Sequence, residues 1–298
     1  MFYAQFAKKQ NLPANHGKTV EWRKWNTFDK ATQLQEGVIP TGQKFGMSSK
    51  TGVINQYGTY AAITDILELR AYDDTILGAT EEMGASMAET QETLIRDALR
   101  VNTNVLYCDN ITIATGVAAG TPTTPAEMEA SATVLCALTP DSVAKAVTIM
   151  KKNRVPTING KYYAVIHPSV AYDLRKSKEW IEAHKYSATT EIWNGEIGEL
   201  HGVRFVVSHN AKVTSQTLSD GAGMVYSSIF LGKDAFGIID VAGGNMEMII
   251  KSKEQAGGPL NQFSTAGYKF EDGGKILYNE RMLRVESCSE YSKIDEAN

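Results

Sequence analysis

The chain has 298 residues, of which 43 % are hydrophobic, so it can bury a core as one large domain or as two smaller ones. The formal net charge of −4 leaves no basic field that would bind DNA tightly. No apolar run approaches the roughly 20 residues that span a bilayer, and the first residues lack the apolar centre of a signal peptide, so we expect synthesis in the cytosol and no membrane partner.

Residues 1–35 mix large aromatic side chains with basic ones and show no sustained period. Within residues 1–30, six Lys or Arg stand against two acids, which gives this arm +4 and leaves −8 for the rest of the chain. Disordered tails rarely hold so many aromatics, so we expect the arm to lie on its own subunit or on a neighbouring one. A solvated tail and a contact with nucleic acid are the alternatives. Acidic surface is expected to hold the basic residues Lys8, Lys9, Lys18, Arg23 and Lys24.

Residues 36–64 contain five glycines, a proline and several Ser and Thr around short strand-like pieces such as Val53 to Tyr60. This composition predicts a long polar hairpin. A connection of this length with so few core-quality side chains is uncommon inside a compact domain and is usually functional. We therefore expect the hairpin to project from the subunit and to be covered by a neighbour.

The longest predicted element is one amphipathic helix from Ile76 to Tyr107, about 48 Å long at about 1.5 Å per residue. Asp73 and Asp74 precede it as N-caps. Apolar or small residues recur on one face, at Ile76, Leu77, Met83, Met87, Leu94, Ile95, Leu99 and Val101. The polar face is expected to carry Glu81, Glu82, Glu89, Glu92, Arg96 and Arg100, with Glu92 and Arg96 at a stabilising i,i+4 spacing. Two helices kinked near Gly84 are the alternative.

Helices and strands follow in irregular alternation. Pro140 and Pro168 each occupy the first position of a predicted helix. A short strand at 111–114 precedes a loop at 116–132, and further strands are expected at 162–166, 203–207, 224–231, 236–241 and 246–250, with a strand-rich stretch at 275–285. This order, with hairpin-like neighbours late in the chain, favours an α+β fold over a doubly wound sheet.

The sequence contains no complete catalytic template. Gly17-Lys18-Thr19 imitates the end of a phosphate-binding loop, but Leu12 stands where that loop begins with glycine. Gly221-Ala222-Gly223 begins a dinucleotide fingerprint, but Tyr226 stands where it continues with glycine, so a turn is the better interpretation. Glu81 and Glu82 diverge on a helix and are expected to be solvated. We therefore predict that the chain is not an enzyme.

No metal or cofactor site is predicted either. None of the histidines has the spacing of a zinc ligand set. They are His16, His167, His184, His201 and His209. His167 is expected to be a strand-end residue and not a base. Cys108, Cys136 and Cys288 are widely separated, so we expect them to be reduced and buried.

Several segments together carry a family resemblance. Tailed-bacteriophage major capsid proteins have a strand, a helix and a glycine-containing run that this chain resembles, at Val165-Ile166-His167-Pro168, at Asp173-Leu174 and from Asn194 to Ser208. The closing segment of that family is similar to Gly258-Pro259-Leu260-Asn261-Gln262, Gly267-Tyr268-Lys269 and Lys275 to Glu286. The arm and hairpin of its podovirus-type branch resemble Gly17 to Arg23 and Gln56-Tyr57-Gly58.

The resemblance implies the α+β fold called HK-ninety-seven-like after a Hong Kong phage. It implies an N-terminal arm at 1–35, an extended loop at 36–68, a peripheral domain at 69–132 with a spine helix at 76–107, an axial domain at 133–245 and a return to the peripheral domain at 246–298. It also implies self-assembly of pentamers and hexamers into an icosahedral shell, which encloses double-stranded DNA without sequence-specific binding. The protein would be made in the host cytoplasm and reside in the virion capsid. Portal, scaffolding or decoration proteins are the further partners it allows.

Two other functions belong to different classes. Encapsulin-type nanocompartments use the same fold to enclose enzyme cargo, and an enzyme with an atypical site would be a monomer or small oligomer. Within the shell interpretation, Lys44 or Lys50 could form an isopeptide bond with Asn279, but ordinary surface residues are the better interpretation of all three.

Overall fold

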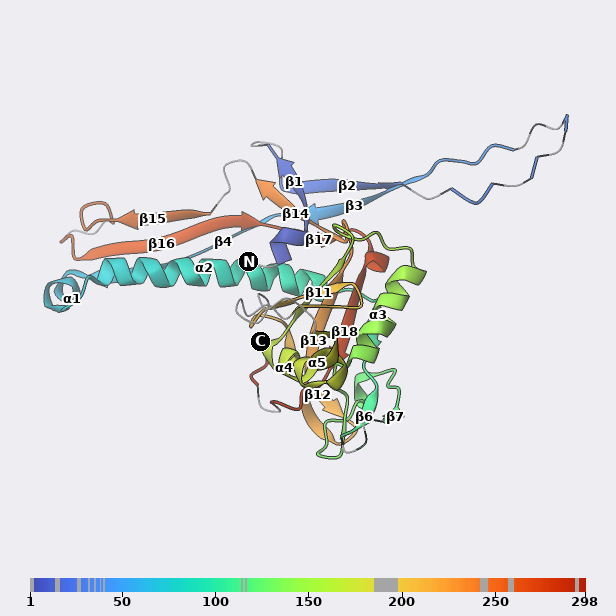
Figure 1. Cartoon of the computed structure of the whole chain (residues 1–298). Coiled ribbons are helices and arrows are strands. Elements are labelled where there is room, and N and C mark those ends of the chain that lie inside the picture. Colours follow the sequence, from blue (N-terminus) through green and yellow to red (C-terminus); the bar gives the residue numbers. More distant parts are fainter. Residues whose placement is uncertain are drawn as a thin grey trace.

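The computed structural model describes residues 3–13, 17–25, 28–31, 33–34, 36–37, 39, 41–113, 115, 117–184, 198–241, 246–256, 260–292 and 295–298. A long helix and a narrow sheet lie side by side and form an elongated part (Figure 1). A compact region of helices and strands adjoins one end of this part, and a hairpin projects beyond the same end (Figure 1). His16, positions 194–197 of the capsid-like run and the pair Gly258-Pro259 lie outside the described residues.

The long helix α2 spans Thr75–Arg100 without interruption, so the kinked alternative near Gly84 is wrong. The carboxylate of Asp74 accepts hydrogen bonds from the backbone N–H groups of Ile76 and Leu77, at 3.1 and 3.2 Å, which confirms the predicted N-cap. At about 1.5 Å per residue the helix is about 39 Å long. It is one rigid element along the elongated part of the subunit.

The predicted continuation of this helix to Tyr107 is wrong. The side chain of Asn102 donates a hydrogen bond to the carbonyl of Met282 and accepts one from the N–H of Asn104. An asparagine that bonds backbone groups in this way competes with the helical hydrogen bonds. The branched and aromatic residues that follow form strand β5 (Val105–Tyr107), parallel to β18 (Met282–Ser287).

The two faces of α2 also differ from the prediction at four positions. Leu77 and Val101 are exposed. Glu92 and Arg96 are each only 3 % exposed. They are buried because backbone groups satisfy them: the N–H of Tyr3 donates to Glu92, and Arg96 donates to a carbonyl at 2.9 Å in the mixed region.

The narrow sheet beside α2 has the order β15-β16-β4, formed by Glu247–Lys251, Phe263–Asp272 and Asn55–Thr64. Strand β4 pairs with β16 along its whole length, from Asn55↔Asp272 to Thr64↔Phe263. Met83 of α2 packs against residues of β16 in one apolar cluster. A short helix α1 (Asp65–Arg70) connects this sheet to α2.

The predicted hairpin within 36–64 is wrong in its pairing. Strand β3 (Met47–Val53) pairs antiparallel with β2 (Thr19–Trp25) from the N-terminal arm, while β4 pairs with β16. The reason is Trp22, which is buried against two glycines: a Cβ atom at Gly52 or Gly237 would lie 2.5 or 2.9 Å from its ring. The projecting hairpin therefore consists of β2, β3 and the residues between them (Figure 1).

The described part of the arm lies on its own subunit, which is one of the two positions expected for it; the other is a neighbouring subunit. Turn η1 (Tyr3–Phe6) places Tyr3 in the core, fully buried. Strand β1 (Lys8–Leu12) pairs parallel with β14 (Phe236–Val241), which also pairs with β17 (Gly274–Ile276). Leu12, Trp22 and Ile239 share an apolar cluster at the base of the hairpin.

The compact region contains a mixed sheet with the strand order β10-β11-β9-β13-β18-β5. The strands not yet named are β10 (Glu199–Leu200), β11 (Val203–Val207), β9 (Tyr162–Ile166) and β13 (Gly221–Leu231). A further strand, β12 (Val213–Leu218), pairs with β13. Helices α3, α4 and α5 cover it, at Pro140–Lys152, Pro168–Lys176 and Lys178–His184. Parallel and antiparallel pairs coexist in this sheet, which fits the predicted α+β class.

Small elements complete this region. Strands β6, β7 and β8 form a separate sheet, at Asn110–Thr112, Ala118–Gly120 and Val134–Leu135, with turns η2 at Pro125–Glu127 and η3 at Asn279–Arg281. Cys108, Cys136 and Cys288 all lie in the apolar cluster beneath α3 and are free thiols, as expected.

Candidate assembly surfaces

The projecting hairpin carries an aromatic cluster that its own subunit does not cover. The rings of Trp25 and Phe45 stack with centroids 4.6 Å apart, and Phe28 stacks on Phe45 at 5.2 Å. Trp25 is 54 %, Phe28 60 % and Phe45 56 % exposed. Met47, the strand partner of Trp25, is 48 % exposed. We call Trp25, Phe28, Phe45 and Met47 the hairpin surface. Apolar patches of this kind on a soluble protein mark an interaction site.

A second apolar surface lies at the opposite end of the elongated part, around α1 (Figure 1). Thr64 caps this helix by accepting a hydrogen bond from the N–H of Leu67, yet none of its residues is buried. Ile66 and Leu67 are more than half exposed, Leu69 is 85 % exposed, and Tyr72 is fully exposed. We call Ile66, Leu67, Leu69 and Tyr72 the α1 surface. A helix without a buried face lacks the packing that usually stabilises it, so a neighbour must supply that packing.

The base of the hairpin is held by buried apolar contacts, whereas the described contacts farther out are exposed. Trp22 and Ile54 are buried in the cluster that also holds Leu277. Beyond Trp25, the two limbs are joined in the described part of the chain by the aromatic stacks and by two hydrogen bonds between Asp29 and Gln43, at 2.9 and 3.2 Å. The hairpin can therefore present its surface to a neighbour without disturbing the core.

One basic residue of the arm meets acidic surface of its own subunit. Lys24 lies 3.7 Å from a carboxylate oxygen of Glu280 and 4.7 Å from the ring centroid of Tyr278. Lys8, Lys9, Lys18 and Arg23 are exposed, so acidic contacts with a neighbour remain a prediction for them. Because exposed pairs are individually weak, several would have to act together.

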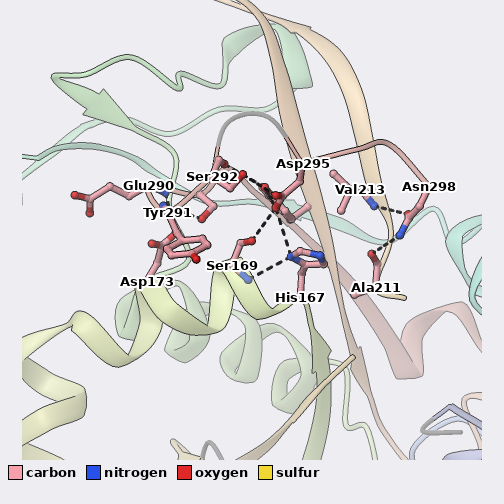
Figure 2. A network of polar contacts seen from close by, with 12 residues as sticks. His167, Ser169, Asp173, Ala211, Val213, Glu290, Tyr291, Ser292, Asp295 and Asn298 are labelled. Carbon is pink, nitrogen blue, oxygen red and sulfur yellow. Dashed lines mark hydrogen bonds and ion pairs between the residues drawn. The ribbon is translucent and has the colours of Figure 1, made fainter. Parts of the chain in front are cut away.

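The densest polar network lies where the C-terminal segment crosses α4 (Figure 2). Asp295 accepts hydrogen bonds from the hydroxyl groups of Ser169, Tyr226 and Ser292, at 2.7, 2.6 and 2.6 Å, and Nδ1 of His167 lies 3.9 Å away. Burial raises the pKa of Asp295, but the hydroxyl groups outweigh burial, so its pKa is lowered. The carboxylate holds strand β13, helix α4 and the C-terminal segment together.

This network brings Ser, His and Asp together without forming a catalytic triad. The hydroxyl of Ser169 donates to Asp295 and not to the imidazole, whereas a nucleophilic serine needs a histidine base. Nδ1 of His167 instead accepts the backbone N–H of Ser169 at 3.2 Å, as the N-cap of α4. Burial is the largest cause of the lowered pKa of His167, and the neutral imidazole suits an acceptor. The prediction that His167 is a strand-end residue is confirmed.

The other candidate motifs are not brought into a common site. Gly17 to Thr19 leads directly into β2, and Gly221 begins β13 after the tight connection from β12. Lys44, Lys50 and Asn279 are exposed surface residues. Within the described residues, no group of three or more His, Cys, Asp and Glu side chains could hold a metal ion. No helix in the described part of the chain is both long and apolar enough to cross a membrane.

The sequence profile of the phage capsid protein family matches residues 48–270. The chain belongs to this family. The match spans most of both regions of the fold, including the narrow sheet, α2 and the mixed sheet. It confirms the predicted major capsid protein of a tailed phage and does not favour the encapsulin alternative. Capsid proteins are structural, which agrees with the lack of a catalytic arrangement in the polar network.

Solved capsid structures share the fold. The capsid of Ralstonia phage GP4 matches with a TM-score of 0.69 and 14 % identity over 97 % of this chain and 89 % of that one. The capsid of cyanophage Pam1 matches with a TM-score of 0.66 and 13 % identity, over 93 % and 87 % of the two chains. The head of Helicobacter pylori bacteriophage KHP40 gives 0.64 and 11 %, over 95 % and 88 %. No curated protein matches the chain by sequence. The predicted HK-ninety-seven-like fold is confirmed.

The sequence analysis does not predict the α1 surface, because the predicted boundary between the extended loop at 36–68 and the peripheral domain at 69–132 runs through it. The signal was present in Asp65 to Arg70, where apolar residues stand at 66, 67 and 69 within one helical turn and a half. Positions 66 and 69 share one face of the helix and 67 lies about 100° around from 66, so the apolar side chains spread over a broad part of this helix. Such a pattern in a short helix indicates surface that a neighbour covers.

Proposed function

We propose that the chain builds a closed shell of pentamers and hexamers in which the hairpin surface of one copy covers the α1 surface of a neighbour. The observation that carries this proposal is the pair of exposed apolar surfaces at opposite ends of one chain (Figure 1). A contact between two unlike surfaces is heterologous, and it forms rings when its rotation closes. Rings of five and six copies together can close a shell.

The five-part division of the chain belongs to this proposal, with two changes. The arm at 1–35 and the extended loop at 36–68 act as one assembly element, because β2 from the arm and β3 from the loop pair over seven residues. The peripheral domain at 69–132 contains the spine helix, the axial domain covers 133–245, and 246–298 returns to the peripheral domain. Strands β5, β6, β7 and β18 of the two peripheral segments, however, belong to the compact region and are assigned to the axial domain.

The proposed shell encloses double-stranded DNA without sequence-specific binding and without catalysis. A chain of net charge −4 suits this role, since it confines DNA without gripping it. Portal, scaffolding and decoration proteins are the proposed further partners. Synthesis in the host cytoplasm precedes assembly.

Cysteine cross-linking tests the proposed contact directly, because the three native cysteines are buried and give little background. The Phe45→Cys/Tyr72→Cys double variant is assembled, oxidised mildly and run on a non-reducing gel. We expect a covalent ladder that neither single variant forms. The control pairs Phe45→Cys with Ile181→Cys, a half-exposed position on α5. Dimers from a single variant would indicate like-with-like contacts, and assembled shells without a ladder would refute the pairing.

A further inference from the structure

The hairpin joins the body of the subunit where the chain passes from β3 to β4, at Val53, Ile54 and Asn55, which we call the corner. Val53 is the last residue of β3 and Asn55 the first of β4, so the chain changes sheets across one residue. Ile54 is buried, and its N–H donates to the carbonyl of Lys18 at 3.0 Å. The direction of the hairpin therefore depends on how firmly this corner is held.

Asp272 and Gly273 hold the corner from the other side. Asp272 is the strand partner of Asn55 at the end of β16. Gly273 lies so close to the corner that a Cβ atom there would be 2.6 Å from the carbonyl oxygen of Val53. Its own carbonyl accepts the N–H of Ile239 at 3.1 Å, which ties the corner to β14. Any movement of Asp272 is transmitted to the base of the hairpin.

Asp272 is a buried carboxyl group with incomplete hydrogen bonding. It is only 3 % exposed. Its Oδ1 accepts the N–H of Gly273 at 2.7 Å, while its Oδ2 is buried and has no partner in the part of the chain that the structure describes. It faces a cavity of about 140 Å³, lined also by Ile95 and Ala98 of α2 and by Asn55 and Tyr57 of β4. A cavity of that size has room for water beside the unpaired oxygen.

No cation compensates a charge at this position. Among the described side chains that line the cavity, Tyr57 is the only titratable one besides Asp272. The charged residues on the neighbouring elements include Glu92, Arg96, Asp97 and Arg100 on α2, Lys269 and Glu271 on β16, Lys275 on β17 and Lys50 on β3. None of them is a cause of the shift in the pKa of Asp272. Burial is the largest cause and raises this pKa, against the smaller lowering effects of Gly273 and Gln91.

We propose that Asp272 is a protonation switch for the corner, fixing the hairpin when the carboxyl group is neutral and loosening it when the group ionises. The neutral group is less costly to bury, because a protonated carboxyl needs no counter-charge. Ionisation leaves a buried charge that Gly273 and Gln91 stabilise only in part, so the cavity must take up water. This inference rests on the proposed role of the hairpin only for its biological consequence: the hairpin adapts to its neighbours when loose and is fixed when protonated.

The direction with pH follows from the raised pKa. Stability that depends on the neutral group is complete below the ordinary pKa of an aspartate, 3.8, and is lost as the pH rises through the higher value of the folded state. The corner is therefore held at acidic pH and loosened toward neutral pH. Asp272→Asn places a neutral amide at the site and removes this dependence.

Hydrogen exchange of the full, unassembled chain from pH 3 to pH 7, a range that begins below the ordinary pKa of an aspartate, tests the switch, with each rate divided by the intrinsic rate at that pH. We expect protection of peptides covering 18–25 and 47–55 to fall with rising pH, by about tenfold for a one-unit difference between the two pKa values. Asp272→Asn should stay protected throughout. Asp240→Asn, at an exposed carboxylate on β14, is the matched control and should follow the unmodified chain.

A flat profile in the unmodified chain, or the same slope in Asp272→Asn, would overturn the proposal. If Asp272→Asn does not fold, carboxyl ¹³C NMR of the unmodified chain decides: titration of Asp272 at or below 3.8 refutes the switch. Because these measurements use single subunits, their failure is separate from a failure of shell assembly.

Discussion

Replacing residues 28–45 with a turn of five Gly and Ser residues should leave the subunit folded and abolish assembly. The cut stops before β3 because Gly52 covers Trp22 at the base of the hairpin. It removes Phe28 and Phe45 from the hairpin surface and the exposed hydrogen bonds between Asp29 and Gln43. All of these contacts lie outside the buried clusters of the subunit.

The expected change in folding stability is small because its terms oppose one another. Shortening a loop of about 20 residues to fewer than 10 favours folding by about 0.6 to 1 kcal/mol through the closure entropy. Loss of the exposed aromatic stacking costs about 0.5 to 1.5 kcal/mol. The net change lies within about 1 kcal/mol, which for a domain of this size moves the melting temperature by less than about 4 °C.

The expected change in assembly is large. Phe28 and Phe45 are 60 and 56 % exposed in the subunit, so covering them buries about half of each side chain anew. At about 1.5 to 3 kcal/mol for a whole large apolar side chain, the pair contributes roughly 2 kcal/mol per contact, or about 30-fold in affinity. A shell repeats this contact at every subunit, so the losses accumulate.

Circular dichroism melting and sedimentation velocity on the same sample measure both effects. Phe28→Ser/Phe45→Ser keeps the length of the hairpin and should also fail to assemble, while Ile181→Ser on α5 serves as the control and should assemble. A deletion variant that no longer folds would place the hairpin in the core. Normal shells from the deletion variant would refute the role of the hairpin surface.

The remaining predictions concern the α1 surface, the spine helix and the C-terminal segment. Leu69→Ser/Tyr72→Ser should melt like the unmodified subunit, because both side chains are exposed, and should fail to assemble in sedimentation velocity. Ile95→Ala, 1 % exposed, should lower the free energy of unfolding by about 2 to 5 kcal/mol in urea, whereas Leu77→Ala on the exposed side of the same helix should change it by less than about 0.5 kcal/mol. Asp295→Asn should destabilise the subunit at pH 7, and this difference should vanish as the pH falls through the lowered pKa of Asp295, because a lowered pKa gives stability that acid removes; a pH-independent difference would contradict the charge on Asp295.

The sequence predicts the regular elements well where local signals agree with packing. Asp74 as the cap of α2, Pro140 and Pro168 at the starts of α3 and α4, and the strand at 162–166 are all found where the pattern places them. In each case capping chemistry or burial on both faces determines the element from nearby residues alone.

Long-range contacts account for what the sequence does not reveal. The burial of Glu92 and Arg96 depends on Tyr3 and Asn210, which lie 89 and 114 residues away. The pairing of β3 with the arm depends on the packing of Trp22 against Gly237 on β14, a strand far away in the sequence. An amphipathic pattern cannot distinguish a solvated charge from one whose partners come from other elements. For the same reason, the sequence alone located the projecting segment but not its strand partner.

Electron microscopy of the purified full-length chain tests the central claim most directly. The account predicts closed particles built from rings of five and six copies, formed by the chain alone or with its assembly partners co-expressed, and lost in the hairpin and α1 variants but not in Ile181→Ser. A stable monomer at micromolar concentration under every salt and pH condition, with and without those partners, would contradict it.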